Sequence, residues 1–399
     1  MALPIPRPPP VTSATRPESD MGVSFSSGCD ALVILPGGPV PGCSPGPRSS
    51  EPARTVAFPS VTRYHEPELT SPVDLCGPDG RFNRAAVGWS RHPLHRCNLA
   101  PSLERPKKWN YWAVTTNDLL FSTTIADMER LQLGGAYFFH RGTKLHLDKT
   151  VTRPPGTIAI PEYVHGDMVI EHPDMRVSHT DEGAGTRLQV WAADFQGYPL
   201  EADIHVRRPD GHETLNVVIP WNDLSIQFTS KQNTLPATGY IQLGDTRYDL
   251  GEGAFGCLDY GRGVWPLHTV WNWGAASGVR DGRLVGFNLG DKWTTGTGMN
   301  ENGLCIDGKL SKISEDLVLD YDRMDWMKPW TVRTSESDRI DLVFEPEYDR
   351  HGTSGRREAW FTEVHQMFGV YRGTIVPDSG QVITVRDLFG WIEEHEARW

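Results

Sequence analysis

Acidic side chains flank a pair of tryptophans in the C-terminal half of the chain. Asp259 precedes Trp271 and Trp273, and Glu301 follows them. A carboxylic acid buried against tryptophan has a raised pKa, so it can donate a proton to an alkene or a leaving group near neutral pH. An aromatic face can stabilise the cation that then develops. This combination predicts acid-catalysed hydration, cyclisation or isomerisation, with Glu301 and Asp259 as the acids and His268 as a proton partner.

The tryptophans belong to a patterned segment, Val270–Gly278, which reads VWNWGAASG. Residues two apart on a strand point to the same face, so Trp271 and Trp273 share one face and Asn272 lies on the other. The small residues that follow leave space beside the rings. These tryptophans form either an aromatic wall for a ligand or a plug in a barrel core, and both interpretations remain open.

The same pattern occurs earlier, in Lys108–Thr116 (KWNYWAVTT). Because repeated positions usually encode architecture, we expect function where the two copies differ, and the second copy carries additional polar groups. Asp259 and Glu301 have a structural alternative, which is a salt bridge, for example with Arg262. The predicted ligand-binding side chains are Trp271, Trp273, Asn272, Arg262, Trp109 and Asn288.

Several functions fit these residues. The first hypothesis is binding of an apolar small molecule, such as an isoprenoid, a lipid or a polyketide-like compound, in a β-barrel cavity, with acid catalysis as a hydratase, cyclase or isomerase. The alternatives are a carrier without turnover, a carbohydrate-binding or carbohydrate-active protein, and a structural β scaffold. Two carboxylates facing each other across an open cleft would favour the carbohydrate hypothesis. A closed and mainly apolar cavity would count against that hypothesis.

The composition excludes several classes of partner. The chain has 399 residues and a formal net charge of −12, and an acidic balance argues against nucleic acid as a partner. We find no apolar run of about 20 residues and no apolar core of a secretory signal, so we expect no stable membrane insertion and a cytoplasmic location. The sequence predicts neither the oligomeric state nor whether Met1 or Met21 is the start.

Neither a metal site nor a cofactor is expected. The six cysteines are scattered without a C-x-x-C pair, so no disulfide framework or zinc site follows. His92 and His95 have a proline between them and no nearby carboxylate. The glycine-rich stretch Thr294–Gly303 lacks the lysine and the helix context of a phosphate-binding loop. We interpret His365, in an apolar strand, as a hydrogen-bonded core residue.

The chain divides into a tail, an arm and two domains. Residues 1–60 are rich in Pro, Gly and Ser and are predicted to be disordered, and residues 61–104 form an ordered arm. Four hairpin pieces of residues 105–252 recur in the same order in residues 253–399, which predicts two related β domains. Successive hairpins favour antiparallel β-barrels. The exceptions are Ser314–Met327, a weak helical candidate, and Val385–Trp399, predicted as a short C-terminal helix.

Several motifs together resemble a known family. The chain from about Glu66 to Trp399 resembles the bacterial family "domain of unknown function 2804" in GRFNRAAVGWSRHPLHRCNL, KKWNYW, WNWGAASG, NLGDKWTTGTGMNENGLCIDGKLSKI and HQMFGVYRGTI. More distantly, Cys257–Gly274 is similar to a segment of the carotenoid hydratase and AttH-like group. That resemblance implies two tandem lipocalin-like (calycin-type) barrels and apolar substrates. The group's Asp-His-x-Trp-Gly pattern is absent, since Tyr260 follows Asp259, which weakens the acid role implied for Asp259.

Overall fold

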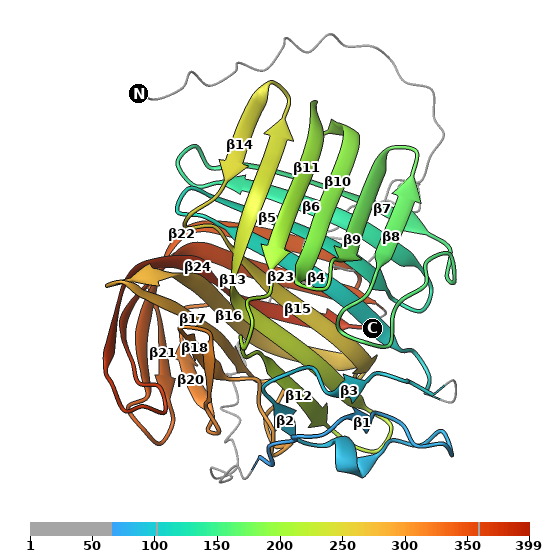
Figure 1. Ribbon diagram of the computed structural model, residues 1–399, viewed down its shortest axis with the longest axis vertical. Helices are drawn as coiled ribbons and strands as arrows, with labels where there is room; N and C mark the ends of the chain where they lie inside the picture. The colour runs from blue at the N-terminus through green and yellow to red at the C-terminus, as the bar shows by residue number, and fades with distance from the viewer. Residues whose placement is uncertain (1–65, 101–102, 358–359) are drawn as a thin grey trace, which may run out of the picture.

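The computed structural model describes residues 66–100, 103–357 and 360–399 (Figure 1). Within these ranges the chain is almost entirely β-structure, and the one helical element is a 3-10 turn at Arg84–Ala86. No helix in this part of the chain is long and apolar enough to cross a bilayer. The predicted disordered tail, residues 1–60, lies outside the described residues.

The first sheet is an antiparallel meander that continues into a second run of strands. Its order is β7-β6-β5-β4-β15-β13-β11-β10-β9-β8, with β12 and β14 also paired to β13 and β2 paired to β12. The sheet curls so that β5 and β6 pack against β9 across an apolar core. Its strands are β2 (Trp89–Ser90), β4 (Lys107–Thr115), β5 (Leu119–Asp127), β6 (Gln132–His140), β7 (Leu145–Arg153), β8 (Met168–His172), β9 (Met175–Asp181), β10 (Gly185–Phe195), β11 (Tyr198–Arg207), β12 (Leu215–Pro220), β13 (Ile226–Leu243), β14 (Thr246–Leu250) and β15 (Phe255–Val264).

The second sheet repeats this topology with fewer strands. Its order is β19-β18-β17-β16-β24-β23-β22-β21-β20, and β17 packs against β20 around a second apolar core. Each sheet, with the strands that form it, is one unit of the chain. In the first unit the meander β7-β6-β5-β4 pairs with the last strand, β15, and in the second the meander β19-β18-β17-β16 pairs with the last strand, β24. The predicted internal duplication is therefore confirmed. The strands are β16 (His268–Arg280), β17 (Arg283–Asp291), β18 (Gly303–Ile306), β19 (Lys309–Lys312), β20 (Leu317–Asp320), β21 (Trp330–Thr334), β22 (Ile340–Gly355), β23 (Phe361–Ile375) and β24 (Ile383–Arg398).

The chain changes sheet between Val264 and His268. Strand β15 pairs with β4 and β13 and so completes the first sheet, while β16 pairs with β24 and β17 in the second. The change of sheet therefore comes 12 residues after residue 252, where the first domain was expected to end. Hairpin signals in the sequence do not reveal this boundary, because β15 pairs with β4, a strand far from it along the chain.

The predicted C-terminal helix is wrong, because those residues form strand β24. Strand β24 lies between β16 and β23 and is buried on both faces: Trp391 faces the first sheet, whereas Ile392 faces the core of the second. A strand with two buried faces carries apolar residues in succession, which hides the alternation that would identify it. The stretch Ser314–Met327 likewise holds β20 and turns rather than a helix.

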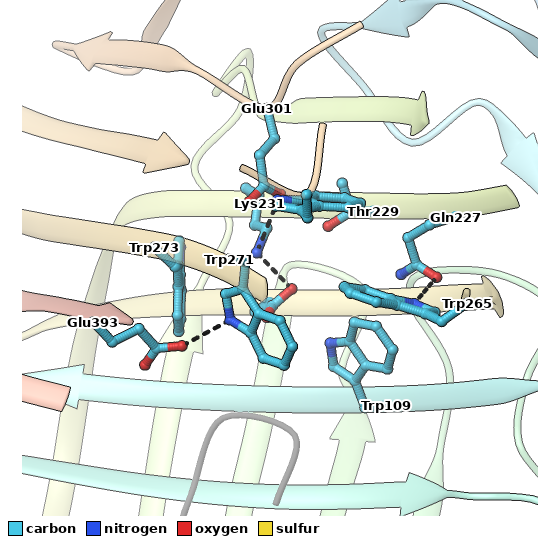
Figure 2. A pocket seen from close by; sticks show the side chains of 11 residues that line it. Trp109, Gln227, Thr229, Lys231, Trp265, Trp271, Trp273, Glu301 and Glu393 are labelled. Atoms are coloured by element: carbon cyan, nitrogen blue, oxygen red, sulfur yellow. Dashed lines mark hydrogen bonds and ion pairs between the residues drawn. The ribbon is translucent and has the colours of Figure 1, made fainter. Parts of the chain in front are cut away.

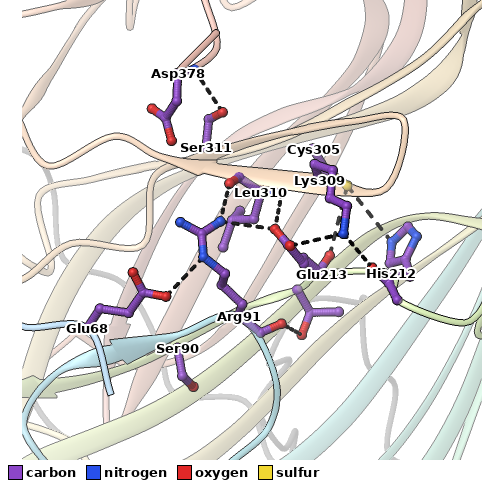
Figure 3. Close-up of polar contacts among 12 residues, drawn as sticks. Glu68, Ser90, Arg91, His212, Glu213, Cys305, Lys309, Leu310, Ser311 and Asp378 are labelled. Carbon is purple, nitrogen blue, oxygen red and sulfur yellow. Dashed lines mark hydrogen bonds and ion pairs between the residues drawn. The ribbon is translucent and has the colours of Figure 1, made fainter. Parts of the chain in front are cut away.

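The arm makes polar contacts with both units of the chain (Figure 3). It contains β2 and the short parallel pair β1 (Val73–Asp74) and β3 (His95–Arg96). Arg91 makes ion pairs with Glu68 (2.9 Å) and with Glu213 of the first unit (3.0 Å), and it donates a hydrogen bond to the carbonyl of Leu310. Lys309, in the second unit, binds the other oxygen of Glu213 at 3.2 Å. The arm thus ties the two units together.

Candidate functional site

A third apolar cluster lies between the two sheets and contains most of the predicted aromatic residues. It surrounds a small cavity (Figure 2), which lies between the sheets rather than inside either barrel. Strands β4, β13 and β15 line it from the first sheet, and β16 and β24 from the second. The lining residues are Trp109, Gln227, Thr229, Lys231, Asp259, Trp265, Trp271, Trp273, Trp293, Glu301 and Glu393.

Strand alternation places the first sheet's polar groups in this cavity. Gln227, Thr229 and Lys231 are two apart on β13 and so share the face turned to the second sheet. Lys231 lies directly opposite Asp259 of β15 in the strand register. Directly opposed residues on antiparallel strands are close enough for their side chains to interact, and Lys231 Nζ lies 2.9 Å from Asp259 Oδ1.

Glu301 reaches the same lysine from the second unit. Its Oε2 lies 3.3 Å from Lys231 Nζ, and its Oε1 accepts a hydrogen bond of 3.2 Å from the indole N–H of Trp293. The loop that carries it is fixed by hydrogen bonds, including one from the Gly290 amide to the Asn302 side chain. A Cβ at Gly290 would lie 2.8 Å from Glu301 Oε1, so glycine there makes room for the carboxyl group.

Lys231, Asp259 and Glu301 are buried together, and their charges shift the pKa values of Lys231 and Glu301. Burial raises the pKa of Glu301 to about 7, and Asp259 adds to the rise, whereas Lys231 and Trp293 oppose it. Burial acts to lower the pKa of Lys231, but Asp259 and Glu301 outweigh it and raise that pKa. At neutral pH the lysine is therefore charged, and Glu301 is present in both its acid and its carboxylate form.

Tryptophan rings form the walls of the cavity. Trp265, in the link between the sheets, stacks on Trp293 with ring centroids 5.1 Å apart and contacts Trp271 and Trp109 at 5.5 Å and 5.7 Å. Lys231 Nζ lies 4.5 Å from the ring centre of Trp273. The face of Trp273 thus stabilises the buried ammonium group of Lys231.

A third carboxylate completes the wall on the β24 side. Glu393 accepts hydrogen bonds from the indole N–H of Trp271 at 3.0 Å and from the side-chain amide of Gln366 at 2.8 Å. It is fully buried and lines the cavity. These bonds hold the plane of the Trp271 ring, so Glu393 orients the aromatic wall.

Besides the carboxylate oxygens of Asp259 and Glu301 that face Lys231, three buried polar groups of the lining lack a hydrogen-bond partner among the described residues. They are the indole N–H of Trp109, the side-chain amide nitrogen of Gln227 and the hydroxyl of Thr229. Buried donors without a partner are rare and often bind water or a ligand. The space open to the centre of a water molecule is about 20 Å³, enough for about one or two waters. The cavity therefore fits a water or the reactive end of a small ligand.

The structure brings some predicted residues to the cavity and not others. Asp259, Glu301, Trp109, Trp271 and Trp273 line it. Asn288 stands just behind the wall, where it accepts a 2.8 Å hydrogen bond from the Trp273 indole and donates one of 2.6 Å to the Glu301 carbonyl.

Three predicted site residues lie on the opposite faces of their strands. Arg262 is three positions from Asp259, so it points into the first barrel, where it binds the side chain of Asn110. Asn272, between the tryptophans, turns into the second barrel and bonds to Tyr321 at 3.1 Å. His268 is exposed and paired with Glu396 at 2.9 Å. None of the three reaches the cavity, and the predicted salt-bridge partner Arg262 is replaced by Lys231.

Lys231, Gln227, Thr229, Trp265, Trp293 and Glu393 were not identified from the sequence. Lys231 lies in the polar run SKQNT, far from both acids along the chain, and only the pairing of β13 with β15 joins them. Trp265 and Trp293 each follow a short stretch rich in glycine and charged residues. Such stretches are typical of exposed turns, so they gave no sign of a buried site. Glu393 was assigned to a helix that does not exist.

The raised pKa of Glu301 predicts a pH-dependent stability. The folded protein holds the Glu301 proton up to about pH 7, whereas the unfolded chain loses it near pH 4.5. Stability from this group is therefore full below pH 4.5 and is lost as the pH rises to about 7, a change of about 3 kcal/mol. Chemical denaturation of the wild type and of Glu301→Gln at pH 4.5 and pH 7.5 measures this change in the free energy of unfolding. An unchanged difference between the two proteins at the two pH values would contradict the raised pKa.

A second prediction concerns the close approach of Trp109 to β15. A Cβ at Gly261 would lie 2.1 Å from the Trp109 ring and 2.5 Å from the Gln227 amide nitrogen. Gly261→Ala should displace both cavity groups and lower the free energy of unfolding by about 1–3 kcal/mol, with a changed near-UV circular dichroism spectrum. Gly251→Ala is the control, because no atom lies within 4 Å of its added Cβ. Equal stability of the two variants would show that the ring is not held there.

Two solved structures are similar to this chain. An AttH-like protein from Nitrosomonas europaea is 10% identical, with 73% of this chain and 92% of that chain covered and a TM-score of 0.43. Kievitone hydratase from Nectria haematococca is 9% identical, with 75% and 90% covered and a TM-score of 0.44. No curated protein matches the sequence. Residues 66–399 match the family described as "Domain of unknown function (DUF2804)", and the chain belongs to that family.

Proposed function

We propose that the protein binds a small, mainly apolar molecule in the cavity between its sheets and that Glu301 transfers a proton to it. The observation that carries the proposal is a buried carboxyl group, with a pKa raised to about 7, on the wall of a tryptophan-lined cavity. A general acid works best when its pKa lies near the working pH. The unpaired donors beside it suit one ligand oxygen or one water.

The chemistry that fits best is addition of water to a carbon–carbon double bond. Glu301 gives its proton to one carbon, the π electrons form the new C–H bond, and the other carbon becomes a cation. The tryptophan rings of the wall stabilise this cation, and the carboxylate of Asp259 offsets the charge of Lys231 beside it. Water then adds to it and returns a proton to Glu301, so the acid is regenerated. If the cation instead loses a different proton to Glu301, the result is isomerisation. If a second double bond attacks it, the new cation loses a proton to Glu301, and the result is cyclisation.

The size of the cavity limits the ligand. Because only about 20 Å³ is open to the centre of a water molecule, a ligand of more than a few atoms enters only if a tryptophan ring moves. The five tryptophan rings of the lining suit an unsaturated carbon skeleton, and its few unpaired donors suit a ligand with few oxygens. The alternative function, a carrier without turnover, would bind the same ligand in the same cavity. It would differ only in that Glu301 transfers no proton to the ligand.

The experiment is extraction of the purified protein with organic solvent, followed by mass spectrometry and a binding titration. We expect a co-purifying unsaturated molecule. We also expect saturable quenching of tryptophan fluorescence by a five-carbon unsaturated alcohol. Trp271→Leu should weaken this binding about tenfold, because it removes one aromatic wall. Trp191→Leu, at an exposed tryptophan on β10, should leave it unchanged. A bare protein that shows no saturable quenching would refute the binding proposal.

A further inference from the structure

A second cluster of polar side chains lies on the opposite face of the second sheet from the tryptophan cavity. Asp349 and His351 on β22 and Glu363 and His365 on β23 are neighbours there. His351 and His365 are directly opposed in the strand register. Single nitrogen or oxygen atoms of His351, Glu363 and His365 lie within 4.8 Å of one another. This cluster plays no part in the proposed proton transfer.

A β-bulge creates the cluster. Phe344 on β22 points into the core of the second sheet, and plain alternation would turn Tyr348 the same way. The register shifts between Pro346 and Tyr348, so Tyr348 packs instead against the cluster between the sheets. Asp349 and His351 therefore share a face with His365. Bulges commonly re-aim side chains next to functional sites.

The hydrogen bonds of His365 orient it as a metal ligand would be oriented. Its Nδ1 lies 2.9 Å from Asp349 Oδ2, and its ring stacks on Trp326 with centroids 4.1 Å apart. A carboxylate on one nitrogen of a histidine fixes the ring and leaves the other nitrogen, Nε2, for a metal ion. His365 is hydrogen-bonded, as the sequence predicted, and it is half-buried, with its side chain 15% exposed.

The two remaining groups supply further ligands at the solvent edge. His351 Nε2 lies 3.5 Å from Glu363 Oε1, close to the separation of about 3.4 Å between two ligands of one tetrahedral zinc ion. The other oxygen of Glu363 is paired with Arg357 at 2.6 Å, and Arg357 also binds Glu396. These pairs neutralise the surrounding charge and leave Glu363 Oε1 facing the histidines.

We propose that His351, His365 and Glu363 bind a divalent transition-metal ion, with water completing the coordination. Two imidazoles and one carboxylate suit zinc and its neighbours rather than calcium or magnesium, which prefer oxygen. The two imidazole rings are nearly parallel, with centroids 4.1 Å apart. His365 keeps its place, and the exposed His351 ring turns to bring a nitrogen to the ion. The ligands come from two strands, which is why short-range spacing in the sequence gave no sign of a metal site.

The test is isothermal titration of ZnCl₂ into the full chain, without a histidine tag and after dialysis against a chelator, with native mass spectrometry for stoichiometry. We expect one ion per chain in a saturable reaction. His351→Gln, at an exposed side chain, should weaken binding at least tenfold without loss of folding. His365→Gln should do the same.

His205→Gln is the matched control, because His205, in the first sheet, is also an exposed histidine paired with a glutamate, Glu182. It should bind zinc as the wild type does. The proposal is overturned if no ion binds saturably, or if His205→Gln weakens binding as much as His351→Gln. Because this readout is metal affinity, failure here leaves the Glu301 proposal untouched.

Discussion

Lys231→Met lowers the free energy of unfolding by about 3–5 kcal/mol, because the substitution leaves two acids buried without their cation. Lys231 Nζ lies 2.9 Å from Asp259 and 3.3 Å from Glu301, and the three side chains are at most 8% exposed. A neutral water molecule in the cavity does not replace the lost charge. The measurement is chemical denaturation of both proteins at pH 7.5, where Glu301 is largely ionised in the wild type.

Lys309→Met is the control for this experiment. Lys309 also binds a glutamate, Glu213, but its side chain is 67% exposed, and exposed ion pairs contribute about 1 kcal/mol or less. Adding Asp259→Asn and Glu301→Gln to Lys231→Met should recover most of the lost stability, since no buried charge then remains unpaired. If Lys231→Met were no more destabilising than Lys309→Met, the buried triad would not be charged as described.

Glu301→Gln should abolish turnover while ligand binding persists. The amide keeps the shape of the side chain but has no acidic proton, and loss of a general acid typically lowers kcat by about 10²–10⁴-fold. In the wild type the rate should fall as the pH rises through about 7, because only the protonated form donates. The measurement is kcat and Kd with the molecule recovered from the purified protein.

Glu345→Gln, at a partly exposed glutamate of the second sheet paired with Arg372, is the matched control and should leave kcat unchanged. Equal kcat values for the wild type and Glu301→Gln would assign the protonation to another group. A molecule that binds equally to both proteins and is transformed by neither would instead identify the protein as a carrier.

Part of the site could be predicted from the sequence because local patterns encode it. The two-residue spacing of Trp271 and Trp273 fixes their common face whatever the tertiary structure, and the repeat of that pattern at Trp109 indicated an equivalent strand. Asp259 and Glu301 were found because they flank the tryptophans. The all-β, duplicated architecture followed from turn chemistry and repetition.

Other parts depend on long-range pairing that local patterns do not contain. Lys231 meets Asp259 only through the β13–β15 register, and no spacing in the sequence announces it. Arg262 and His268 were predicted as site residues because they are near in sequence, but strand alternation turns them away. Each sheet has aromatic residues on the face that points away from its own core, and the cavity forms where these two faces meet. The sequence of one repeat alone does not show that the two faces meet.

The most direct test of this account is the ionisation of Glu301 itself. Infrared difference spectroscopy between pH 5 and pH 9 detects the carbonyl band of a protonated carboxyl group, and comparison with Glu301→Gln assigns it. A raised pKa of Glu301 predicts a carboxyl band that disappears with a midpoint near pH 7 and is absent from Glu301→Gln. Spectra in which the two proteins show the same carboxyl bands throughout this range would contradict it, because Glu301 would then be an ordinary ionised partner of Lys231.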